Sequence, residues 1–298
     1  MKGSDLRRQL RRQFQYVLIS SLLLFIQVLP RSWSLALCPV LADLAWQVLP
    51  KERRKVLFNL RLIFPQECDH EKMSREIFRA MAKNAVDAIR LPRLAGKDIE
   101  SLVMASGLEH FDRAYRRGQG VVAVTGHIGC WELIPAWFAQ RGYRIGVIGK
   151  RVYDPRLDRL LNRARAKWGI QVIDRDSGAK EALRALHRGQ ALGILIDQDT
   201  RVASVEVRFM GHPARTPTGA AMLARKTGAA VVPLAIHRLP GGRHRLTILP
   251  ELKPSPSRDR RQQTIEDVQQ ETRAIEELIK RDLTQWAWMH PRWTRKPD

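Results

Sequence analysis

Short apolar runs alternate with helix-like segments through residues 121–249, and this alternation constrains the fold more than any other feature. Strands that alternate with helical segments pack as a sheet layered by helices, so the pattern predicts an α/β fold. The strands are expected at 121–125, 144–148, 171–173, 192–196, 230–236 and 245–249. The helices are expected at 131–140, 155–167, 179–188 and 217–227.

The first 50 residues have a different character, with two apolar stretches between basic ends. A basic run at 7–12 precedes the stretch 17–29, and a basic cluster at 51–55 follows the stretch 33–49. A helix over 17–29 spans about 20 Å, short of the roughly 30 Å hydrocarbon layer of a bilayer. Basic flanks place both ends on the cytoplasmic side, which favours a shallow membrane hairpin or an interfacial helix pair, with Trp33 and Trp46 at the interface. A signal peptide and a buried helix pair are the alternatives.

These observations divide the chain into residues 1–50, a membrane anchor or interfacial hairpin, and residues 51–298, a single α/β domain that begins with a helical lead-in over 51–95.

The net charge is +22 and the pI is near 10.9, which predicts anionic partners such as nucleic acid, acidic lipid or an acidic protein. The three cysteines, Cys38, Cys68 and Cys130, are too widely spaced for a disulfide framework or a zinc knuckle. The phosphate-binding glycine fingerprints and the serine-hydrolase elbow are missing.

His127 and Glu132 form the most informative local pattern, H-x-x-x-x-E, directly after the apolar run at 120–124. In a continuous helix this spacing separates two side chains by about 140°, so a loop must bring them together. Gly126 and Gly129 supply the backbone freedom for such a loop. A carboxylate that holds one imidazole nitrogen leaves the other free to take a proton from a hydroxyl, which predicts a general base. An ordinary buried polar pair is the alternative.

Further polar groups follow other apolar runs. Asp197-Gln198-Asp199 comes directly after 194–196, and 209–213 leads into 216–219; both are expected at strand carboxyl ends, where active groups of such sheets gather. The carboxylates can orient a donor or position Arg165, or simply begin a loop. The aromatic segment 285–293 either stacks on rings or closes the core, with Arg292 and Arg295 available to face an anion.

Taken together and in this order, these segments resemble the late acyltransferases of lipid A biosynthesis, the lauroyl/myristoyl type of Gram-negative bacteria. The resemblance covers most of the chain. Its landmarks are Arg54, Asn59-Leu60, Phe64-Pro65, Gly126-His127-x-Gly129-x-Trp131-Glu132, Arg165 before Gly169, Asp197-Gln198-Asp199, Thr218-Gly219, Val231-Val232-Pro233 and Gln285-Trp286-x-Trp288-x-His290-x-Arg292-Trp293.

The resemblance implies a mixed sheet flanked by helices, of the glycerolphosphate-acyltransferase type. It implies transfer of a fatty acyl chain from acyl carrier protein to a hydroxyl of an anionic lipid A precursor, at the cytoplasmic face of the bacterial inner membrane, with no metal and no cofactor. His127 is then the base and Glu132 its orienter, while Arg165 and Asp197 bind substrate or shape the site. The family loop commonly reads His-Phe-Gly-Asn-Trp-Glu, so Ile128 and Cys130 depart from it. Cys130 is expected to be a buried thiol, a covalent nucleophile being the alternative.

Three other functions stay open at this stage. A related branch of the family acylates mannosylated lipids, so the acceptor is one open choice. A thioesterase would use the same dyad on water. A basic nucleic-acid-binding protein would explain the charge, although the apolar N-terminus argues against nucleic acid as the partner. The sequence shows no ruler for acyl chain length.

Overall fold

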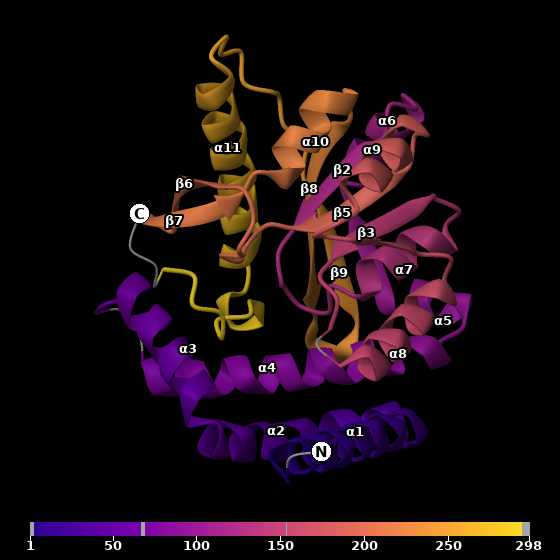
Figure 1. Cartoon of the computed structure of the whole chain (residues 1–298), viewed down its shortest axis with the longest axis vertical. Helices are drawn as coiled ribbons and strands as arrows, with labels where there is room; N and C mark the ends of the chain where they lie inside the picture. Colours follow the sequence, from indigo (N-terminus) through magenta and orange to yellow (C-terminus); the bar gives the residue numbers. More distant parts are fainter. Residues whose placement is uncertain (1–2, 67–68, 153, 294–298) are drawn as a thin grey trace.

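A seven-stranded sheet forms the centre of the computed structural model, which describes residues 3–66, 69–152 and 154–293 (Figure 1). The strand order is β1-β9-β8-β2-β5-β3-β4, and every neighbouring pair is parallel except β8 and β9. The expected mixed α/β sheet flanked by helices is therefore confirmed. Its strands are β1 (Val103–Ser106), β2 (Val121–Thr125), β3 (Ile145–Gly149), β4 (Gln171–Asp174), β5 (Ala191–Leu195), β8 (Ala230–Arg238) and β9 (His244–Ile248).

The two faces of the sheet pack against different helices because successive strand side chains point to opposite sides. On β2, Val122 and Val124 join the core beneath α9, α10 and α11, whereas Val121 and Ala123 join the core beneath α5, α6 and α7. All five residues of β2 are buried, as expected of a central parallel strand. The helices of the body are α5 (Gly96–Leu102), α6 (Leu108–Arg116), α7 (Leu133–Gln140), α8 (Pro155–Ala166), α9 (Ala179–His187), α10 (Gly219–Thr227) and α11 (Arg260–Lys280), with short 3₁₀ turns η1 (Leu91–Arg93), η2 (Pro240–Gly242) and η3 (Leu283–Gln285).

The segment 209–213 does not follow a strand of the main sheet, contrary to expectation. It makes the turn of a separate antiparallel hairpin, β6 (Ser204–Phe209) and β7 (His212–Pro217), which packs on α11. Met210 and Gly211 both have positive φ, 49° and 80°, which is the geometry of a two-residue hairpin turn. The pairing is local, but the helix α11 on which the hairpin packs is distant in sequence, and the composition of 209–213 gave no signal of that contact.

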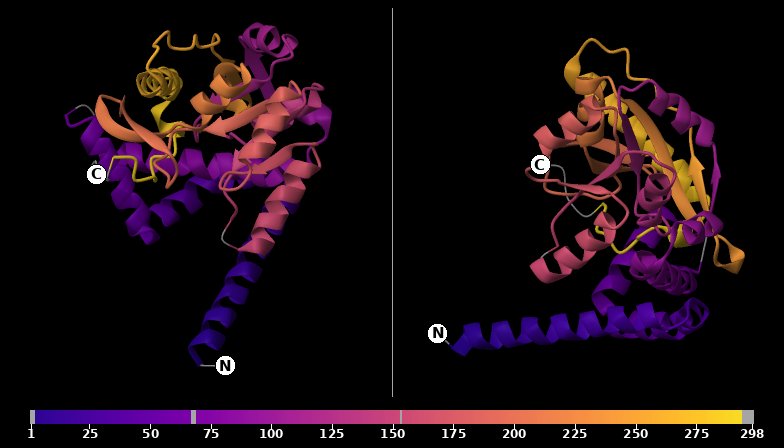
Figure 2. Two further views of the ribbon diagram at one scale, coloured as in Figure 1. Left: turned by 45° about the horizontal axis from the view of Figure 1, so that its top comes forward. Right: turned by 90° about the vertical axis from the view of Figure 1, so that its right-hand side faces the viewer.

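The N-terminal helices that precede α5 and the sheet are, in the described residues, α1 (Gly3–Val28), α2 (Arg31–Val48), α3 (Pro50–Ile63) and α4 (His70–Arg90). Helix α4 lies between α2 and the sheet-bearing body, and α1 projects away from that body (Figures 1 and 2). In the described residues, no single helix is long and apolar enough to cross a membrane, but α2 and α3, bent by 93°, pass that test as a pair. The division into anchor and domain stays a prediction, and the side chains of the basic run 7–12 lie outside the described residues.

The helices α1 to α3 carry most of the apolar side chains that face solvent. Of the 18 exposed large hydrophobic residues among the side chains that the structure describes, 15 lie between Phe14 and Phe58. Trp33 is 66% exposed, as an interfacial residue would be, but the expectation for Trp46 is wrong: it is buried, and its indole Nε1 donates to Ser74 Oγ at 3.0 Å. Trp46 therefore joins α2 to α4, whereas the exposed ring of Trp33 is available to contact another surface.

A buried carboxylate fastens the N-terminal helices to the sheet. Asp87 on α4 accepts hydrogen bonds from Arg31 of α2 (Nε to Oδ1, 2.7 Å), from Arg238 of β8 (Nη2 to Oδ2, 2.6 Å) and from His244 of β9 (Nε2 to Oδ2, 2.8 Å). Burial opposes ionisation, but these hydrogen bonds and the two guanidinium charges outweigh it and hold the pKa of Asp87 well below its usual range. The α1–α4 layer is thus joined to β8 and β9 by charge-assisted contacts.

Candidate active site

His127 and Asp197 meet because β2 and β5 are adjacent and parallel. The register pairs Thr125 of β2 with Leu195 of β5. His127 and Asp197 each come two residues after this pair, so both reach the same edge of the sheet. His127 Nδ1 lies 2.8 Å from Asp197 Oδ1, and the backbone N–H of His127 donates to Asp197 Oδ2 at 2.7 Å. This is the carboxyl edge of the parallel strands, where ligands bind in open α/β sheets.

The buried Asp197 carboxylate fixes the tautomer of His127. Burial alone would raise the pKa of Asp197, but the charge of His127 and hydrogen bonds from His127 and Trp286 outweigh it and lower the pKa to about 2. The ionised carboxylate can only accept, so the His127 Nδ1 carries the proton and donates it to Asp197. The other ring nitrogen, Nε2, is then an acceptor. The pair has the geometry of an oriented general base.

The expectation that Glu132 orients His127 is wrong in this structure. Glu132 is the N-cap of α7 (φ −67°, ψ −20°), and within the described residues its side chain makes no hydrogen bond or ion pair with His127. Its carboxylate instead accepts from Arg165 of α8, Nε to Oε2 at 3.0 Å and Nη2 to Oε1 at 2.6 Å. The four predicted site residues therefore form two pairs, His127 with Asp197 and Glu132 with Arg165.

The two glycines of the His127 loop serve different needs. Gly129 has a positive φ of 58°, and a Cβ there would stand 2.0 Å from the carbonyl oxygen of Ile236. Gly126 has no positive φ, but a Cβ there would lie 3.1 Å from Asp197 Oδ2. The expected freedom of backbone angles is thus used at Gly129, whereas Gly126 makes room for the Asp197 carboxylate.

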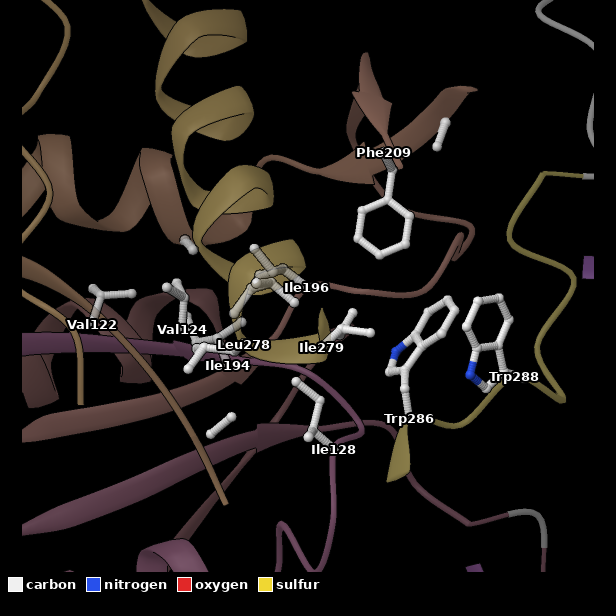
Figure 3. Packing of buried hydrophobic residues seen from close by; sticks show 14 of the residues in the cluster. Val122, Val124, Ile128, Ile194, Ile196, Phe209, Leu278, Ile279, Trp286 and Trp288 are labelled. Carbon is white, nitrogen blue, oxygen red and sulfur yellow. The ribbon is translucent and has the colours of Figure 1, made fainter. Parts of the chain in front are cut away.

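The aromatic C-terminal segment 285–293 supports the site from behind. The Trp286 indole Nε1 donates to Asp197 Oδ2 at 2.7 Å, and the carbonyl oxygen of His127 accepts from the N–H of Ala287 at 3.0 Å. Trp286 and Trp288 are buried beside Phe209, near Ile128 (Figure 3). Of the two roles expected for this segment, ring stacking and core closure, the structure shows core closure and adds a contact to Asp197.

Helix α3 holds the same C-terminal segment through one buried amide. Asn59 Nδ2 donates to the carbonyl oxygens of Trp288 at 2.9 Å and His290 at 2.8 Å. Arg292 is buried as well, and its Nη2 donates to Thr216 Oγ1 at 2.5 Å, so it binds the hairpin and does not face a ligand. Arg295 lies outside the described residues. The landmark residues at both ends of the chain thus hold the site together.

The amides of the His127 loop are already used. The N–H of His127 donates to Asp197, that of Ile128 to the Gly126 carbonyl at 2.8 Å, and that of Gly129 to the Gln285 carbonyl at 2.9 Å.

Cys130 is 2% exposed, and burial raises the pKa of its thiol well above the usual range. A thiol held in this way is a packing residue, not a nucleophile, because the thiolate is the reactive form. Cys38 is likewise a buried free thiol, and Cys68 lies outside the described residues.

A cavity of about 550 Å³ opens in front of these pairs. His127, Glu132 and Arg165 line it together with Trp131, whose ring meets the imidazole edge-on at a centroid distance of 5.0 Å. Its volume lies within the roughly 300–1,000 Å³ typical of small-molecule sites. Most of the remaining lining is apolar and comes from β3, β4, β5, α7, α9 and α10, including Ile134, Val147, Ile173, Leu183, Leu195, Met222 and Leu223. The cavity therefore joins an acid–base group to a largely apolar space.

Comparison with known proteins places these features in a family. The model of the family described as bacterial lipid A biosynthesis acyltransferase matches residues 1–295. A lipid A biosynthesis lauroyltransferase of Escherichia coli is 26% identical over 263 residues, which cover 87% of this chain and 84% of that protein. A lipid A biosynthesis myristoyltransferase of E. coli is 29% identical over 220 residues, covering 70% of this chain and 67% of that protein.

A phosphatidylinositol mannoside acyltransferase of Mycobacterium tuberculosis is also similar, 29% identical over 164 residues. The match covers 53% of this chain and 49% of that protein, so this chain spans about half the length of its mycobacterial relative. Among solved structures, the 1-acyl-sn-glycerophosphate acyltransferase of Thermotoga maritima aligns over 84% of this chain and 98% of its own, with 18% sequence identity and a TM-score of 0.37. That score is too low to establish a shared fold.

Proposed function

Because this chain belongs to the bacterial lipid A biosynthesis acyltransferase family, we propose that it transfers a fatty acyl group from an acyl carrier protein thioester to a hydroxyl of a lipid A precursor. The observation that carries the proposal is the Nδ1–Asp197 contact of His127 at the mouth of an apolar cavity. An oriented base beside a long apolar space suits a reaction that joins a hydroxyl to a fatty acyl chain.

In this proposal His127 Nε2 takes the proton of the acceptor hydroxyl while the hydroxyl oxygen attacks the thioester carbon. The resulting tetrahedral intermediate collapses by breaking the carbon–sulfur bond, and His127 returns the proton to the departing thiolate. Asp197 stabilises the imidazolium that exists between the two transfers. The hydrogen bond from Trp286 keeps Asp197 in place, and the indole N–H takes the donor position that a buried water would otherwise fill.

The developing oxyanion needs a donor that the loop amides at His127, Ile128 and Gly129 cannot provide, since each already donates elsewhere. Of the four basic side chains that line the cavity, Lys150, Arg165, Arg175 and Lys226, we choose Arg165, which Glu132 fixes with two hydrogen bonds that use Nε and Nη2. Its Nη1, which faces Gly149, is left to point at the substrate. We therefore assign Arg165 to the oxyanion or to the acceptor, and Glu132 to holding Arg165.

The same proposal places the chain at the inner membrane with its active site on the cytoplasmic side. The exposed apolar side chains of α1 to α3 support this placement, because contiguous apolar surface on a soluble protein marks an interaction site. The charge of +22 suits an acidic carrier protein, an acceptor that bears phosphates and an anionic leaflet. A bound nucleic acid is not part of the proposal.

The test compares wild type with His127→Ala, with acyl carrier protein thioester as donor and a lipid A precursor as acceptor. General-base catalysis contributes about 10² to 10⁴ in rate, so the variant should lose most transfer while its thermal unfolding is unchanged. Turnover near the wild-type rate would exclude His127 as the base. Free fatty acid formed at the same rate with and without acceptor would identify a thioesterase instead.

The mycobacterial relatives favour one alternative acceptor, a mannosylated phospholipid. Both acceptors present a sugar hydroxyl near anionic groups, so the His127 site does not distinguish them. Parallel assays with the two acceptors, read by mass spectrometry of the products, make the choice.

A further inference from the structure

A second hollow lies next to the catalytic cavity, between β3, the loop that follows it and α8. Its volume is about 660 Å³. It shares four lining residues with the catalytic cavity: Gly149, Lys150, Arg165 and Asp174. A substrate whose reacting end lies at His127 can therefore extend into this hollow.

The lining of the hollow is cationic. Four basic side chains face two carboxylates, Asp158 and Asp174, which leaves a net charge of +2. The basic side chains are Lys150, Arg151, Arg159 and Arg165. Glu132, which holds Arg165 from outside this lining, lowers the charge to +1, so the hollow still favours an anion.

Two of these four cations already have carboxylate partners. Arg165 is held by Glu132, and Arg151 Nε lies 2.8 Å from Asp174 Oδ2. The other carboxylate, Asp158, accepts from the N–H of Val152 at 2.8 Å. It therefore neutralises neither remaining cation by direct contact.

Lys150 and Arg159 are different. Both are exposed, and neither makes an ion pair or a hydrogen bond within 3–66, 69–152 and 154–293. They lie on different elements, Lys150 just after β3 and Arg159 in the second turn of α8, yet they face one hollow. Two unpaired cations brought together in this way repel each other unless an anion lies between them.

We propose that Lys150 and Arg159 bind a phosphate group of a substrate while its reacting end lies at His127. This rests on the proposed acyl transfer, which supplies two substrates with such a group: the acceptor's phosphomonoester, or the phosphodiester that joins the thioester-bearing arm to its carrier protein. Arg159 offers a planar fork for two phosphate oxygens, and Lys150 adds a compact charge. The subsite fixes how far the substrate reaches into the cavity.

The test uses the full chain with both charges removed, Lys150→Gln with Arg159→Gln. Its matched control removes two exposed arginines whose side chains also make no hydrogen bond or ion pair within the described residues, Arg245→Gln on β9 with Arg258→Gln before α11. The subsite predicts that the KM of the phosphate-bearing substrate rises about tenfold in the first variant, with kcat within about twofold, and that the control variant behaves as wild type.

Removing the phosphate from the substrate identifies its source. If the acceptor binds there, a dephosphorylated acceptor raises the wild-type KM by the same factor and has no further effect on the Lys150/Arg159 variant. If the donor binds there, an acyl thioester of N-acetylcysteamine, which lacks the phosphodiester, has that effect instead. KM values for both substrates within twofold of the control variant would overturn the subsite.

A binding measurement separates this proposal from the proposed function. In a ³¹P NMR titration with inorganic phosphate, the Lys150/Arg159 variant should bind about tenfold more weakly than the Arg245/Arg258 control. A chain that transfers no acyl group but shows this difference keeps the subsite and loses the function. Equal phosphate binding by the two variants overturns the subsite whatever the activity.

Discussion

Replacing Asp197 by Asn tests which carboxylate orients the base, because it removes a charge and keeps the shape of the side chain. The Asp197 carboxylate accepts three hydrogen bonds, from His127 Nδ1 at 2.8 Å, from the His127 N–H at 2.7 Å and from Trp286 Nε1 at 2.7 Å. A side-chain amide can still accept the last two. The bond to Nδ1 is the one that changes, since an amide can donate to this nitrogen and so favour the wrong tautomer.

The magnitude follows from that single bond. A hydrogen bond to a charged group contributes about 1.5–3 kcal/mol, which corresponds to a rate factor of about 10 to 150 if it is needed in the transition state. The wrong tautomer adds to this loss, and the whole contribution of a general base, about 10² to 10⁴, sets its upper limit. We therefore expect kcat to fall about 10²-fold or more in Asp197→Asn.

The assay combines acyl-transfer kinetics with ¹⁵N NMR of the His127 ring. Asp197→Asn should lose the Nδ1–H tautomer, whereas Glu132→Gln should keep it and lose activity only through a loosened Arg165. Asp43→Asn is the matched control, because that carboxylate pairs with Arg79 between α2 and α4 and neither residue lines the cavity. A kcat within threefold of wild type in Asp197→Asn, or a tautomer change in Glu132→Gln alone, would refute the assignment.

Three further outcomes follow from the same geometry. Trp286→Phe should lower kcat about tenfold, because one hydrogen bond to Asp197 is lost while the ring stays packed; Trp288→Phe, whose indole bonds the Leu283 carbonyl, should not, and equal kcat losses would contradict the role of Trp286. The pKa of Asp197 is about 2 when folded and near 3.9 when unfolded, so its contribution to stability is complete above about pH 4 and is lost as the pH falls toward 2. Urea unfolding of Asp197→Asn should therefore show less acid dependence over that range than wild type. Burial raises the pKa of Glu271 well above its usual range, and its carboxyl has no hydrogen-bond partner among the described residues. The buried carboxyl therefore destabilises the fold increasingly as the pH rises above about 4.3, so Glu271→Met should raise the free energy of unfolding by about 1–3 kcal/mol at pH 8 and by less at pH 5; an equal effect at both values would disprove this.

The sheet was predictable because its strands are short apolar runs between polar segments. The expected strand 121–125 is β2, and 192–196 and 245–249 are each offset by one residue from β5 and β9. The strand β1 and the hairpin β6–β7 were not predicted. Ser204–Phe209 alternates in burial and draws its stability from α11, which is a long-range contact that local composition does not record.

The members of the site were also predictable, but their pairing was not. His127 and Asp197 each stand just after an apolar run, which places them at a sheet edge. That β2 lies beside β5, and not beside β3, is a property of the strand order alone. Proximity in sequence therefore assigned Glu132 to His127, whereas the strand order assigns Asp197. The contact between Trp286 and Asp197 was harder to predict. The segment 285–293 is dense in aromatic residues, but its sequence does not indicate which ring reaches the site.

The site holds two carboxylates at separate positions, and each binds a different kind of group. Asp197 is 1% exposed and, in the proposed mechanism, faces an imidazole that gains and loses a proton, so its charge has to be fixed by buried hydrogen bonds. Glu132 is 16% exposed and faces the guanidinium of Arg165, which takes no part in the proton transfer of that mechanism. If one carboxylate served both groups, protonation of His127 would alter the hold on Arg165 during turnover. With two, the base can cycle while the guanidinium stays in position, which is the condition for binding the same oxygen before and after proton transfer.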